Sequence, residues 1–81
     1  MVKVFFLKSE EDVFAFFPEN KYSDVNVDLR VSYALGEGHG PCHVEYAEEC
    51  EQASQEESLD LYNNLTKVVG YDLDVLNENF K

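Results

Sequence analysis

The chain has 81 residues, the length of a single domain (1–81) with a small core. Its formal net charge of −11 argues against direct binding to nucleic acid or to an anionic membrane surface, because both depend on Lys and Arg. An apolar fraction of 44% is too high for a disordered chain. No signal peptide or membrane span is recognisable, and two cysteines make no disulfide framework, so we expect a cytoplasmic protein.

Two apolar runs open the chain, at residues 2–7 and 13–17, separated by a polar turn. They are typical of a β-hairpin, and Pro18 is expected to end its second strand because proline cannot donate to the ladder. Residues 25–35 then alternate strictly between apolar and polar, which predicts a half-buried third strand. A glycine-rich stretch ends it, and a weaker alternation around Val44 and Tyr46 predicts a fourth strand.

A helix is predicted after Ser54, because Ser54 and Glu57 have the spacing of a capping box. Gly70 is the expected left-handed residue at its end. The residues expected on its buried face are Leu61, Tyr62, Leu65, Val68 and Val69. Alternation at 71–75 predicts a last strand, and the end of the chain, at Phe80 and Lys81, is expected to fray.

The order β-β-β-β-α-β predicts an α+β fold, a two-layer sandwich. We expect a mostly antiparallel sheet of about five strands with one helix packed on one face. The helix is long enough to serve as a crossover, which permits one parallel strand pair. One sheet face would stay open, and Phe5, Phe14 and Phe16 on it would favour a homodimer.

Residues that bend the backbone and residues that do chemistry are concentrated at positions 35–43. His39 and Cys42 have a spacing that zinc could use, but adjacent Cys42 and His43 would point to opposite faces of a strand. A cysteine nucleophile is disfavoured because nearby acids raise the thiol pKa. We therefore predict no catalytic residue, metal or cofactor. The candidate binding residues are Tyr33, Glu37, His39, Cys42 and His43.

The interval between Arg30 and Lys67 contains eight acids and no Lys or Arg. Such a field could steer a basic protein partner, although it could equally be a solvated surface that maintains solubility. The leading hypothesis is a small, non-enzymatic, acidic interaction module. The alternative is a metal- or small-ligand-binding module centred on the glycine-rich His/Cys loop.

Several segments resemble a group of small bacterial proteins of unknown function. The shared pattern is Phe-Pro, then Ser-Tyr-x-x-x-Gly-Gln-His, then Gly-Tyr-x-Leu-x-Val. The matching residues here are Phe17, Pro18, Ser32, Tyr33, His39, Gly70, Tyr71, Leu73 and Val75, whereas Glu37 and Gly38 stand where the pattern has Gly-Gln. The resemblance implies the same fold class and a bacterial, cytoplasmic origin, and it implies no reaction.

Overall fold

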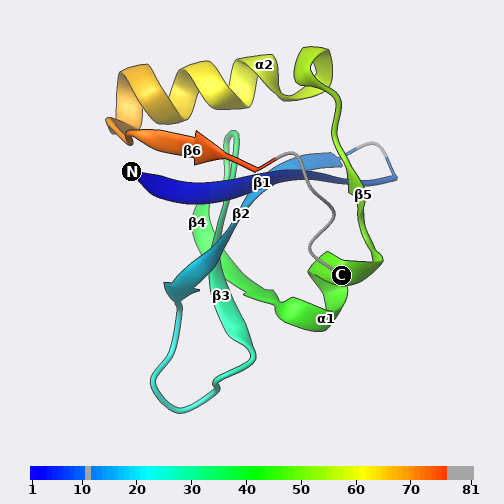
Figure 1. The fold of residues 1–81 in the computed structure, drawn as a ribbon, viewed down its shortest axis with the longest axis vertical. Helices are drawn as coiled ribbons and strands as arrows, with labels where there is room; N and C mark the ends of the chain where they lie inside the picture. The colour runs from blue at the N-terminus through cyan, green and yellow to red at the C-terminus, as the bar shows by residue number, and fades with distance from the viewer. Residues whose placement is uncertain (11, 77–81) are drawn as a thin grey trace.

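A computed structural model describes residues 1–10 and 12–76, and within them six strands form one sheet (Figure 1). The predicted α+β fold class is confirmed. The fraying predicted for Phe80 and Lys81 concerns residues outside the described ones. The elements in chain order are β1 (Val2–Ser9), β2 (Asp12–Lys21), β3 (Leu29–Ala34), β4 (Gly38–His43), α1 (Val44–Glu49), β5 (Glu51–Gln52), α2 (Gln55–Asn63), η1 (Asn64–Val69) and β6 (Leu73–Val75).

The sheet has the order β4-β3-β2-β1-β5, and β6 also pairs with β1. Strands β1 to β4 are antiparallel neighbours, so the predicted first hairpin is confirmed. The far edge of β1 is shared: β6 pairs with its first half in parallel, and β5 pairs with Leu7 and Lys8 in antiparallel fashion. The crossover through α2 and η1 therefore produces the one parallel pair that the sequence permitted.

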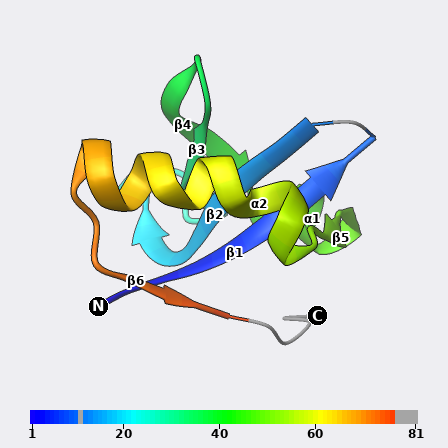
Figure 2. The same ribbon diagram turned by 90° about the horizontal axis from the view of Figure 1, so that it is seen from above.

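Two hydrophobic clusters lie on opposite faces of the sheet, because neighbouring residues of β1 point to opposite sides. Helix α2 covers the first face, lying across the strands in Figure 2, and Leu61 and Leu65 are buried there. The other members of this cluster are Val4, Phe6, Ala15, Phe17 and Ala53.

The second face is not open, which corrects the expectation from the sequence. Phe5 and Phe16 are only 5% and 1% exposed, because α1 packs against them through Ala47. Phe14 is half-buried, and its ring stacks on that of Tyr46 in α1 at a centroid distance of 6.2 Å. The apolar face on which the homodimer expectation rested is thus covered by the chain itself.

Segment α1 was predicted as a strand and is a short helix. The residues that reach the second cluster are Val44, Ala47 and Cys50, at a spacing of three. That spacing fits a helical turn, whereas a strand would place alternate residues inward. The alternation of Val44 and Tyr46 was too short to distinguish the two structures.

The third strand is shorter than predicted, because residues 25–28 form a loop and Val25 is 94% exposed. The hydroxyl of Ser23 accepts hydrogen bonds from the amides of Val25 and Asn26, and the Asn26 side chain accepts one from the amide of Asp28. Short polar side chains of this kind offer the backbone an alternative to a sheet ladder.

Pro18 does not end β2, which continues to Lys21. The register between β2 and β3 shifts between Phe17 and Lys21, so the proline falls where the ladder is irregular. An irregularity of this kind is a place where a sheet tolerates a residue that has no N–H.

The capping box of α2 is confirmed. The hydroxyl of Ser54 accepts from the amide of Glu57 at 3.1 Å, and the amide of Ser54 donates to the Glu57 carboxylate at 3.0 Å. Gly70 ends the helical segment with φ of 98°, the left-handed conformation that was predicted.

The buried face predicted for the helix is wrong at Tyr62, which is 38% exposed, and at the end of the helix. From Asn64 the chain continues as the π-helix η1, and Val68 and Val69 are 77% and 41% exposed. A π-helix has hydrogen bonds from i to i+5 and therefore a wider turn. The wider turn carries Val68 and Val69 off the buried stripe of Leu61 and Leu65.

Candidate functional site

The glycine-rich stretch both turns and pairs: residues 35–37 connect β3 to β4, whereas residues 38–43 are β4 itself, so the fourth strand lies inside the stretch and not around Val44 and Tyr46 as predicted. The turn is short: the amide of Glu37 donates to the carbonyl of Ala34 at 3.1 Å, and Gly36 and Gly38 have φ of 81° and 79°. β4 begins at Gly38 and includes the rest of the stretch.

Tyr33 and His39 are directly opposite each other on β3 and β4. Their rings meet edge to face at a centroid distance of 4.8 Å. Direct cross-strand neighbours are close enough for such a contact, so the hairpin register itself brings these two predicted residues together.

Two residues from the far end of the chain complete this cluster. Nε2 of His39 is hydrogen-bonded to the hydroxyl of Tyr71 at 2.9 Å, and the hydroxyl of Tyr33 donates to Oδ1 of Asn64 at 2.5 Å. Tyr71 also packs against the buried ring of Phe17, at a centroid distance of 5.2 Å. The cluster joins the β3–β4 hairpin to η1 and to the segment that precedes β6.

Sequence reasoning did not include Tyr71 or Asn64 among the site residues. Tyr71 was placed only as a strand residue, and Asn64 lies within the helical segment. No local pattern links either residue to the hairpin. The one available signal was the resemblance, whose pattern contains the counterparts of Tyr33, His39 and Tyr71.

The other predicted site residues do not join the cluster. Cys42 lies three positions beyond His39 on β4 and is buried on the opposite face, in the cluster that α1 covers. Glu37 and His43 are exposed on the hairpin and at the end of β4. Within residues 1–10 and 12–76, no group of three or more His, Cys, Asp or Glu side chains could hold a metal ion.

The two thiols are poorly suited to act as nucleophiles. Burial, with a smaller contribution from Cys50, raises the pKa of Cys42 to about 11. Burial also raises the pKa of Cys50. Both cysteines are free, and the thiolate that a nucleophile requires is scarce at neutral pH.

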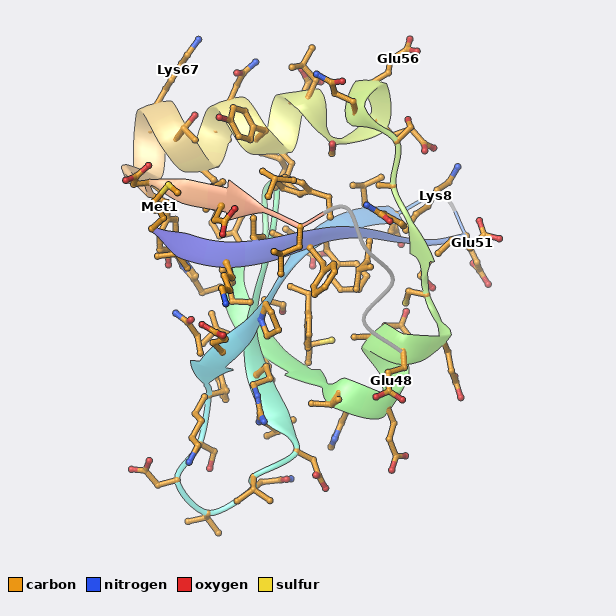
Figure 3. The ribbon with its side chains drawn as sticks, in the orientation of Figure 1. Met1, Lys8, Glu48, Glu51, Glu56 and Lys67 are labelled. Carbon is orange, nitrogen blue, oxygen red and sulfur yellow. The ribbon has the colours of Figure 1, made fainter. Side chains whose placement is uncertain are left out.

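Most of the acids between Arg30 and Lys67, an interval without Lys or Arg, lie along one side of the molecule (Figure 3). We call this surface the acidic face; it is carried by α1, β5 and the first two turns of α2. Figure 3 shows Glu48, Glu51 and Glu56 along this edge, with Lys8 among them. The face consists of Glu45, Glu48, Glu49, Glu51, Glu56, Glu57 and Asp60, all exposed except the half-buried Glu48.

Glu57, on the acidic face, forms an ion pair with Lys8. Its carboxylate is 2.5 Å from Nζ of Lys8 on β1. This contact and the two capping hydrogen bonds with Ser54 lower the pKa of Glu57 to about 2. The pair neutralises one carboxylate and anchors the start of α2 to β1.

Comparison with known proteins gives no relative: no family model, no curated protein and no solved structure matches the chain. The resemblance to small bacterial proteins therefore stays a prediction. Among the described residues, no helix combines the length and the apolar character needed to cross a membrane.

Proposed function

We propose that this protein is a small, non-enzymatic, cytoplasmic module that binds a positively charged protein partner through the acidic face. The observation that carries the proposal is the continuity of this surface. Seven acids between Glu45 and Asp60 occupy three consecutive elements, and that part of the chain contains no Lys or Arg. A predominantly negative surface attracts a positively charged partner and accelerates its association.

The chemistry of the rest of the molecule supports a binding role over a catalytic one. His39 has two tyrosine rings around it and lies away from Cys42, which is buried on the opposite face of the sheet. A thiol with a pKa of about 11 has little nucleophilic character. The acidic face, by contrast, is exposed and is held by a capped helix.

Affinity capture with charge variants tests the proposal. The protein is immobilised at low salt, about 50 mM NaCl, and incubated with lysate from cells that express it. Glu51→Lys/Glu56→Lys reverses two charges on the acidic face. Asp24→Lys/Asp72→Lys is the matched control, because it changes the net charge equally at two exposed acids outside that face.

We expect the wild type and the control to retain the same basic proteins, and the acidic-face variant to lose them. Addition of about 0.5 M NaCl should release them, because exposed charges are then largely screened. Retention of the same proteins by both variants, or of none by the wild type, contradicts the proposal.

A further inference from the structure

The edge of β1 changes its partner halfway along. The amide of Leu76, just after β6, donates to the carbonyl of Val4 at 2.8 Å. The amide of Ala53, just after β5, donates to the carbonyl of Phe6, also at 2.8 Å. The side chain of Gln52 bridges the two approaching segments by donating to the carbonyl of Leu76 at 3.4 Å. Helix α2 passes above this junction.

A pocket of about 460 Å³ lies between the junction and α2. Phe6 forms part of its lining, and the ring of Tyr62 meets that of Phe6 edge to face at 6.3 Å. Leu59 and Val75 contribute further apolar surface. A pocket of this size is large enough to enclose a small ligand or a large side chain.

Large apolar side chains remain accessible at this pocket. Leu59 is 49% exposed and Tyr62 is 38% exposed. The polar lining groups, which make up about half of the lining, are all neutral and include the side-chain amides of Gln52, Gln55 and Asn63. An apolar occupant would therefore gain buried area without leaving a charge unpaired.

Two acids lie next to the pocket on α2. Glu56 is three residues before the lining residue Leu59, and Asp60 is three residues before the lining residue Asn63, so each acid is a neighbour of the lining on the helix surface. The lining itself contains no charged residue. Both acids belong to the acidic face, so the pocket borders the proposed binding surface.

We infer that this pocket receives a large apolar side chain of a Lys- and Arg-rich polypeptide, whose flanking bases pair with the acids of the acidic face. The negative charge beside the pocket disfavours an anionic ligand such as a fatty acid, and a neutral small molecule would make no use of the charge. A basic segment with one aromatic anchor uses both features. This inference rests on the proposed function and names the partner's chemistry.

Two synthetic peptides test the inference: Lys-Arg-Lys-Trp-Lys-Arg-Lys, and the same peptide with Gly in place of Trp, each carrying a fluorescein label. Dissociation constants come from fluorescence anisotropy at about 50 mM NaCl. The protein contains no tryptophan, so the emission of an unlabelled Trp peptide reports the environment of the anchor alone.

We expect the Trp peptide to bind about tenfold more tightly than the Gly peptide, with a blue shift of its emission. Leu59→Glu adds a charge at the pocket and removes an apolar wall, so it should reduce this ratio to about threefold or less and abolish the shift. Val68→Glu is the matched control, since it adds the same charge at an exposed position outside the lining. The control should leave the ratio unchanged.

The outcomes separate this inference from the proposed function. Equal affinities of the wild type for the two peptides, or a ratio that Leu59→Glu leaves unchanged, would overturn the pocket inference alone. Absence of binding by both peptides would overturn the proposed function, and the inference with it.

Discussion

The imidazole of His39 and the hydroxyl of Tyr71 are 32 residues apart in the sequence and 2.9 Å apart in the fold. Their hydrogen bond connects the β3–β4 hairpin, at one edge of the sheet, with the segment that leads to β6 near the opposite edge. His39, a candidate binding residue in the sequence, thus makes a structural contact with Tyr71.

Removal of this hydrogen bond should destabilise the fold modestly. Tyr71→Phe keeps the ring contact with Phe17 and loses only the hydroxyl, so we expect a loss of about 0.5–1.5 kcal/mol in the free energy of unfolding. Urea denaturation measures it. Tyr22→Phe, at a tyrosine that is 49% exposed, is the control. An unchanged midpoint for Tyr71→Phe would show that the bond contributes nothing to stability.

Gly70 should be sensitive to substitution because of its backbone alone. Its φ is 98°, and a Cβ built there meets no atom within 4 Å, so Gly70→Ala adds strain without a clash. We expect a loss of about 1–2 kcal/mol. Gly40→Ala is the matched control, because Gly40 also has open space but no left-handed φ. Equal midpoints for the two variants would contradict the left-handed end of η1.

The Lys8–Glu57 pair should make stability depend on pH. The pKa of Glu57 is lowered from 4.5 to about 2, so its contribution is fully present above pH 4.5 and is lost as the pH falls toward 2. Glu57→Gln keeps an oxygen for the capping box and removes the charge. The variant should have a lower urea midpoint than the wild type at neutral pH, and the difference should vanish between pH 4.5 and about 2. A difference that stays constant over that range would contradict this assignment.

Cys42 should resist alkylation in the folded protein. Its pKa of about 11 leaves little thiolate near neutral pH, and its side chain is buried beneath α1. Iodoacetamide labelling at about pH 8, followed by peptide mass spectrometry, should modify the half-buried Cys50 first. In denaturant both should react at similar rates. Labelling of Cys42 in the folded state as fast as in denaturant would indicate an accessible, activated thiol.

Local signals in the sequence were sufficient for the first hairpin and the helix cap. Ser54 and Glu57 specify a capping box through their spacing, and Gly70 specifies a helix end through its backbone freedom. The alternation of residues 25–28 wrongly predicted a strand. It does not account for the side chains of Ser23 and Asn26, which compete with the ladder for backbone amides.

The candidate site was predictable only in part. Tyr33 and His39 were both predicted as binding residues, but their pairing was not, because the fourth strand was predicted around Val44 and Tyr46, whereas His39 lies in the strand that precedes them. Tyr71 joins them through the crossover to β6, and the pocket beside Phe6 exists because β5 and β6 approach β1 from opposite ends. Both arrangements depend on tertiary topology, which no pattern in the chain specifies.

The most direct measurement of the proposed binding role is the affinity for the glycine-centred basic peptide as a function of salt. We expect binding to weaken steadily from about 20 to 300 mM NaCl, and to be lost in Glu51→Lys/Glu56→Lys but retained in Asp24→Lys/Asp72→Lys. Binding that is insensitive to salt, or weakened equally in both variants, would contradict a partner site on the acidic face.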